Sequence, residues 1–121
     1  MIKKTVEYVD FNGVERVEDC YFNLSKAEVT EMELSVEGGY SEYLKGIVAS
    51  GDTSKILGIF KELILKSYGV KSEDGRRFIK SKELTEEFVQ TEAYNEIFMN
   101  LALDEKASAE FVDGVMPKTI R

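Results

Sequence analysis

The run of residues 52–80 constrains the fold most, because it combines a strong helix pattern with a marked end. Its apolar residues recur three and four positions apart, which places them on one face of a helix. These residues are Ile56, Leu57, Ile59, Phe60, Leu63, Ile64 and Tyr68. Asp52 or Thr53 can cap the start, and we expect Gly69 to end the helix in a left-handed conformation. The run predicts a long amphipathic helix with its wide apolar face mainly in the core.

The segment after this helix is the only basic part of an acidic chain. Residues 72–75 (Ser-Glu-Asp-Gly) predict a turn, because Asp and Gly accept positive φ angles, whereas the structure of residues 76–80 is left open. Residues 51–82 carry four acids and eight bases, residues 1–50 ten and five, and residues 83–121 nine and three. The basic region either balances its acidic neighbours within the fold or contacts an acidic partner or another copy.

The N-terminal residues predict an antiparallel β-hairpin. Residues 3–11 and 14–22 flank Asn12-Gly13, the dipeptide most typical of a tight hairpin turn. A two-residue loop would place Asp10 directly opposite Glu15, a like-charge pair that costs free energy, and a longer loop would avoid it. The register therefore stays open. Two strands alone are marginal in water, so we expect this hairpin to lean on helices.

Four further segments show helix signals. Ser25 and Glu28 form a capping box that starts a helix to about residue 34, and a second helix is expected over residues 40–49 after the Gly-Gly break. Residues 81–89 predict a short helix or turn, Thr91 caps a helix to about residue 103, and Asp104 caps a last short helix that ends at Gly114. The expected apolar positions of these segments include Val29, Met32, Leu34, Tyr43, Leu44, Ile47, Val48, Leu84, Phe88, Tyr94, Ile97, Phe98, Met99, Leu101, Leu103, Ala107, Phe111 and Val112.

Together these signals predict a mainly α-helical α+β fold in one compact domain over residues 1–121. Residues 1–22 form the hairpin, residues 23–117 the helical part with four to five helices, and residues 118–121 a tail. A chain of 121 residues can bury roughly two thirds of the surface that its unfolded state exposes. A packed core is therefore feasible without disulfides or metals.

Composition disfavours several classes of function. The net charge of −7 disfavours nucleic acid as a partner, because phosphate binding needs clustered Lys and Arg. The chain has no His and a single Cys, Cys20, so neither an internal disulfide nor the usual His and Cys metal clusters can form. Gly38-Gly39 lacks phosphate-loop spacing, and residues 72–75 lack the later ligands of a calcium loop. We expect no catalytic residue, cofactor or metal, and no enzyme.

No apolar run is long enough for a signal peptide or a membrane span, so we expect a soluble intracellular protein. The seven Phe and six Tyr exceed what a small core around one hairpin obviously consumes. Most of this apolar surface is expected to be core, and the alternative is a groove for an amphipathic partner helix.

Four ordered segments carry a family resemblance. They are YFNLSKAE at 21–28, IFKELILKSYGVKSEDGRRFIKS at 59–81, TEAYNEIFMNLALD at 91–104 and AEFVDGVMPK at 109–118. Their motifs SYG-x-KS-x-DG-x-x-F, AY-x-x-x-F and F-x-x-G-x-x-P resemble those of the tail assembly chaperones of long-tailed bacteriophages, more narrowly the group in phages of Gram-positive hosts. The resemblance covers nearly the whole chain, and none of its motifs is a catalytic signature.

The resemblance implies a non-enzymatic assembly factor in the host cell cytoplasm. Such proteins bind the tape measure protein, keep it soluble, help the tail tube protein polymerise around it and are absent from the finished virion. The tail tube protein and further copies of the chain are additional expected partners. Whether a longer, frameshifted form exists stays open. The alternative is a phage structural or head-tail joining protein that stays in the virion.

We expect six residues to lie on or beside the partner-binding surface. They are Phe60, Ile64, Tyr68, Arg76, Arg77 and Lys80. The three bases could meet acidic partners, and the three apolar residues nearby could add contact area.

Overall fold

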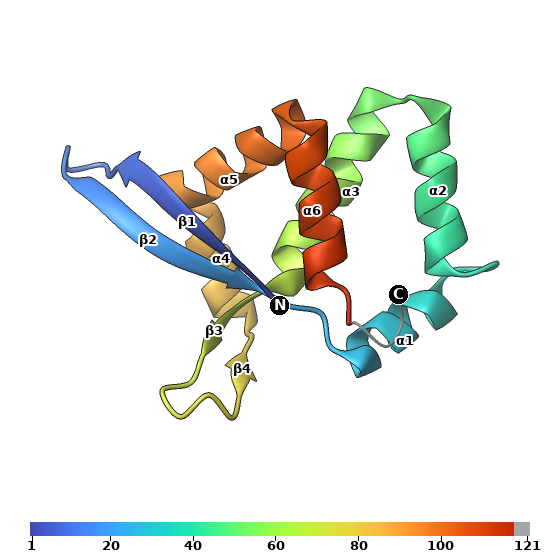
Figure 1. The fold of residues 1–121 in the computed structure, drawn as a ribbon, viewed down its shortest axis with the longest axis horizontal. Helices are drawn as coiled ribbons and strands as arrows, with labels where there is room; N and C mark the ends of the chain where they lie inside the picture. The colour runs from blue at the N-terminus through green and yellow to red at the C-terminus, as the bar shows by residue number, and fades with distance from the viewer. Residues whose placement is uncertain (118–121) are drawn as a thin grey trace.

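The computed structural model describes residues 1–117, apart from the side chains of Ser41 and Val48. The expected tail at residues 118–121 lies outside these described residues. The elements are β1 (Ile2–Val9), β2 (Glu15–Phe22), α1 (Lys26–Ser35), α2 (Tyr40–Ser50), α3 (Thr53–Ser67), β3 (Tyr68–Lys71), β4 (Phe78–Ile79), α4 (Lys82–Val89), α5 (Glu92–Leu103) and α6 (Glu105–Val115). Figure 1 shows a hairpin that extends from a helical body, which confirms the predicted α+β fold class.

The hairpin loop is one residue longer than the tightest turn. Val9 pairs with Glu15, and the Asp10 amide donates to the Val14 carbonyl at 2.9 Å, so three residues form the loop. Gly13 takes the single left-handed position, with φ of 81°. This is the usual form of a three-residue hairpin loop. Asp10 therefore does not face Glu15, and the like-charge pair is avoided.

Helix α3 begins as predicted and ends differently. The Asp52 side chain caps its start by accepting from the Lys55 amide. At its other end Tyr68 is already extended, and the chain continues directly as β3. The expected left-handed cap at Gly69 is wrong, since Gly69 is outside the left-handed region. A side chain there would instead collide with β4, because a Cβ would lie 2.5 Å from Cε2 of Phe78.

Strands β3 and β4 convert the hairpin into a four-stranded antiparallel sheet, in the order β1-β2-β3-β4. β3 pairs with the end of β2, where Phe22 faces Tyr68. Residues 76–80, left open by the sequence, contain β4. The base of the hairpin is thus tied to the helical body, whereas its tip extends away from it (Figure 1).

Phe22 lies at the centre of the core and is fully buried. Its ring contacts Phe111 of α6, Phe88 of α4 and Tyr68 of β3, with centroid distances of 5.3, 6.0 and 5.9 Å. Tyr68 and Phe88 stack in parallel at 3.9 Å. One side chain at the end of β2 therefore joins the sheet to two helices distant in sequence.

The helical part contains six helices within residues 1–117, because residues 82–89 form α4 rather than a turn. The capping box at Ser25 and Glu28 is confirmed. Leu34 was expected to face inward and is instead 82% exposed. α6 continues through Gly114 to Val115, so the predicted stop at Gly114 is wrong; a Cβ at Gly114 would lie 2.9 Å from the Ile2 side chain.

Replacing Phe22 by Ala tests the central position of this ring. We expect Phe22→Ala to lower the free energy of unfolding by about 3–5 kcal/mol, because it removes a fully buried ring and leaves a cavity. Phe11→Ala is the matched control: Phe11 is 78% exposed, and the change should stay within about 0.5 kcal/mol. Urea denaturation followed by circular dichroism measures both. Equal effects of the two substitutions would contradict the described core.

Candidate partner-binding surface

The three apolar residues expected at the partner surface lie at different depths. Ile64 is fully buried in α3, so its side chain contributes to the core and does not reach the surface. Phe60 is half-buried on the same helix. Tyr68 is half-buried, and one face of its ring is stacked on Phe88. Of these three residues, only Phe60 and Tyr68 have exposed side-chain area that a partner could contact.

Arg76 and Arg77 are exposed on the turn between β3 and β4, which extends from the lower side of the molecule in Figure 1. Ser72 and Asp74 brace the turn: the Ser72 hydroxyl donates to Asp74 at 2.7 Å and accepts from the Arg77 amide at 3.0 Å. The hydrogen bonds from Ser72 and from the Arg76 amide lower the pKa of Asp74. Within residues 1–117 neither guanidinium group takes part in a salt bridge. Two cations are therefore presented on a firmly held turn.

Lys80 has a different environment, although it lies close in sequence. Its ammonium group donates to the Glu28 carboxylate at 2.7 Å and to the carbonyl oxygens of Asn23 and Lys66 at 2.7 and 2.8 Å. It thereby connects the start of α1, the end of α3 and the segment after β4. The ammonium group is already engaged within the fold.

Glu28 is the acidic partner of this contact and also belongs to the α1 capping box. Partial burial favours a raised pKa, but the hydrogen bonds from Lys80 and the Ser25 amide outweigh it and lower the pKa of Glu28 below its ordinary value of 4.5. The carboxylate therefore stays ionised in the folded protein at neutral pH.

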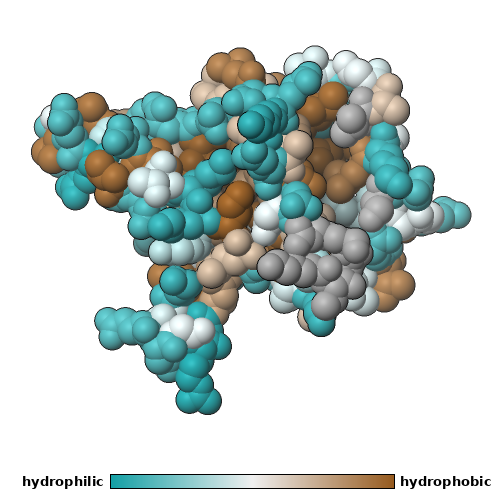
Figure 2. All heavy atoms as spheres, in the orientation of Figure 1, coloured by the Kyte–Doolittle hydropathy of each residue, from teal (hydrophilic) through white to brown (hydrophobic). Residues whose placement is uncertain are grey.

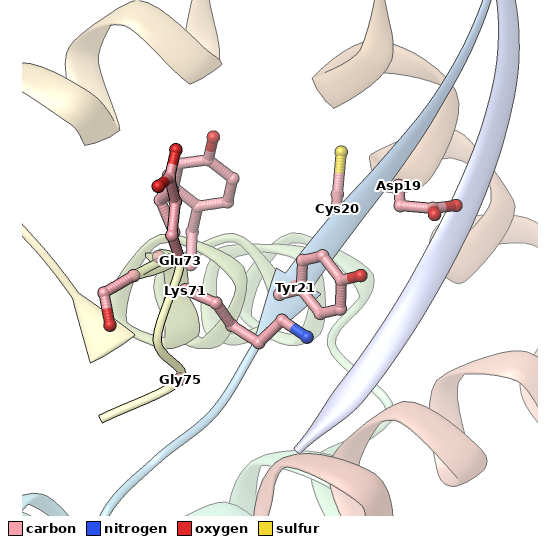
Figure 3. A pocket seen from close by; sticks show the side chains of 10 residues that line it. Asp19, Cys20, Tyr21, Lys71, Glu73 and Gly75 are labelled. Carbon is pink, nitrogen blue, oxygen red and sulfur yellow. The ribbon is translucent and has the colours of Figure 1, made fainter. Parts of the chain in front are cut away.

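A hollow of about 390 Å³ lies beside β2 and the β3–β4 turn (Figure 3). Cys20, Tyr21, Lys71 and Glu73 are among the residues that line it, and the Lys71 ammonium lies 4.6 Å from the centre of the Tyr21 ring. Burial, with the nearby carboxylates of Glu18 and Asp19, raises the pKa of Cys20 to about 11. The thiol is therefore protonated at neutral pH and is a poor nucleophile. No group of three metal-ligating side chains is found within residues 1–117.

Sequence reasoning missed an exposed apolar cluster at the far end of the hairpin, here called the tip patch. It consists of Val9, Phe11, Val14 and Val17, which are 54%, 78%, 50% and 67% exposed. Figure 2 shows hydrophobic side chains at this end of the molecule, among hydrophilic ones. The signal was present in the alternation of the strands, since Val9 and Val17 fall on the face opposite Val6 and Cys20.

Asp10 holds the tip patch in shape. Its carboxylate accepts from the amides of Asn12 and Val14 at 2.9 and 3.0 Å and from Nε of Arg16 at 2.8 Å. The hydrogen bond from Arg16 is the largest cause of a lowered pKa at Asp10. The loop is thus pre-organised, and its exposed apolar side chains sit on a defined backbone.

The family model described as phage tail assembly chaperone matches residues 1–121. The chain therefore belongs to the phage tail assembly chaperone family. Neither a search of curated proteins nor a search of solved structures gave a match. Membership in this family suggests a non-enzymatic role in tail assembly within the host cell. No helix in the described part of the chain has the length and apolarity needed to cross a membrane.

The contact between Lys80 and Glu28 predicts a pH-dependent stability. A carboxylate whose pKa is lowered on folding stabilises the folded state above its unfolded pKa, and this stabilisation is lost as pH falls through the folded pKa. We expect the difference in unfolding free energy between wild type and Glu28→Gln to be largest near neutral pH and to shrink below pH 4.5. Urea denaturation across this range measures it.

Glu31→Gln is the matched control for this prediction, because Glu31 is an exposed carboxylate on the same helix. The difference in unfolding free energy between wild type and Glu31→Gln should change less with pH. A Glu28→Gln difference that stays constant from neutral pH to well below 4.5 would contradict a stabilising role for the ionised carboxylate.

Proposed function

We propose that this chaperone binds the tape measure protein of a long-tailed phage of a Gram-positive host. It keeps this long helical protein soluble in the host cytoplasm while the tail tube protein polymerises around it, and it is absent from the finished virion. The match of the family across residues 1–121 carries the proposal.

Features of the surface support this function. A chaperone for an extended helical client needs exposed apolar contacts and a charge pattern that keeps the complex soluble, and it needs no reactive group. The tip patch offers apolar contacts on a braced loop. The net charge of −7 favours solubility, while Arg76 and Arg77 offer a local site for acidic groups of the client or of a neighbouring copy.

Charge reversal on the basic turn tests the role of this site. We expect Arg76→Glu with Arg77→Glu to reduce the amount of soluble tape measure protein that co-purifies after co-expression, because exposed attractive cations become repulsive anions. Lys55→Glu with Lys61→Glu is the matched control, since it makes the same change in charge at exposed positions of α3. Gel quantification of the soluble and co-purified client measures the effect.

Two outcomes would contradict the proposal at different levels. If the client stays equally soluble and equally co-purified with the reversed turn, Arg76 and Arg77 are not part of the contact surface. If the wild-type chain itself leaves the client insoluble, and mass spectrometry detects the chain in purified virions, a structural or head-tail joining protein becomes the better description.

A further inference from the structure

We propose that the tip patch is the docking site for amphipathic helical segments of the client, and that it selects segments whose apolar stripe is flanked by Lys or Arg. This inference rests on the proposed function and adds the binding element and the chemistry of the segment that it recognises.

The outer face of the hairpin is the face opposite Val6 and Cys20. Val9 is paired with Glu15, and Glu7 is paired with Val17. Directly paired residues share a face, so the two valines lie on one diagonal of this face and the two glutamates on the other. An apolar stripe that crosses the hairpin along the valine diagonal would therefore have a carboxylate on either side.

The loop at the tip has a defined shape. Phe11 and Val14 are exposed in the loop region beyond the paired strands. Val14 lies opposite Asp10, so by strand alternation its side chain falls on the face opposite Val9 and Val17. The hydrogen bonds that Asp10 accepts hold this loop in one conformation. A pre-organised apolar surface loses little conformational entropy on binding, so even a small patch can contribute useful affinity. Phe11 is the one aromatic residue of the patch and is the expected anchor.

Mostly acidic residues form a rim around the patch. Residues 7–18 contain four acids and one base, and that base, Arg16, is paired with Asp10. Glu7 and Glu15 are exposed and take part in no salt bridge within the described chain. The electrostatic complement of this rim is a segment with Lys or Arg beside its apolar residues.

The same charges disfavour other occupants. Two tip patches face to face would bring the Glu7 and Glu15 carboxylates of both copies together, which is repulsive. The turn that carries Arg76 and Arg77 also contains Glu73 and Asp74, so it matches the acidic rim poorly. An anionic membrane surface would repel the rim. The basic amphipathic helix is the remaining complement.

Overlapping synthetic peptides of the phage's tape measure protein test this inference. Each peptide should have about 25 residues, roughly seven helical turns. Fluorescence anisotropy with the purified chain should identify peptides that have an apolar stripe flanked by Lys or Arg. Phe11→Ser with Val17→Thr should weaken the binding of these peptides by about tenfold or more. Leu34→Ser is the matched control: Leu34 is 82% exposed on α1, away from the tip, and its loss should change binding by less than about twofold.

A charge variant completes the design. Glu7→Gln with Glu15→Gln should weaken binding at low salt and reduce the loss of affinity on raising the salt concentration, because it removes the rim charges and keeps the valines. Circular dichroism and thermal unfolding establish that each variant is folded. Wild type and the variant with Phe11→Ser and Val17→Thr, the tip variant, are also co-expressed with the full-length client.

The outcomes distinguish a failure of this inference from a failure of the proposed function. If wild type keeps the client soluble and the folded tip variant binds every peptide as tightly as wild type, the inference fails while the proposed function stands. If wild type neither binds a peptide nor keeps the client soluble, the proposed function fails. If the tip substitutions change only the self-association of the chain, measured by light scattering, the patch is a contact between copies and the inference is overturned.

Discussion

The burial of Phe22 is the interaction on which the rest of the structure depends. Its ring, at the last position of β2, touches rings from β3, α4 and α6. A two-stranded hairpin is marginally stable in water, so β1 and β2 need this anchorage to hold their shape. The consequence is a rigid base and a free tip: the same strand that ends in the core begins in solvent, where Glu15 and Val17 are exposed.

Lys80 forms a second junction, through hydrogen bonds of its ammonium group and not through ring contacts. It joins α1, α3 and the segment after β4 through one ammonium group, and its acidic partner Glu28 also caps α1. A basic residue in the most basic part of the chain is thus engaged within the fold. Arg76 and Arg77, a few residues earlier, lie beyond the short β4 pairing and stay exposed. Within one basic segment, the structure thus separates a cation that holds the fold from two that face outward.

Local signals were sufficient to predict much of this fold. The capping box at Ser25, the caps at Asp52, Thr91 and Asp104 and the hairpin around Gly13 all appear in the structure, because each depends on residues close in sequence. The β2–β3 pairing could not be found this way, since it joins residues 46 positions apart, Phe22 and Tyr68. The same pairing explains the wrong prediction at Gly69, which meets a neighbouring strand instead of capping a helix.

The role of the candidate surface in binding stays a prediction, and only part of its structure was visible in the sequence. The basic turn was visible as a charge pattern, whereas the internal contacts of Ile64 and Lys80 required the tertiary structure. The tip patch was overlooked because Val9 and Val17 resemble ordinary strand residues, and only the absence of a covering element within residues 1–117 distinguishes them from core valines. A surface made of residues typical of a core is difficult to recognise until the packing is known.

We propose that a firmly anchored hairpin presents an apolar tip to a helical client. Methyl nuclear magnetic resonance of the valines tests it most directly, because valines occur both in the tip and in the core. On titration with the tape measure peptide that binds most tightly, the account predicts changes in methyl chemical shift for Val9, Val14 and Val17. It predicts much smaller changes for the buried Val29 and Val115. Unchanged tip valines together with shifts elsewhere would contradict it.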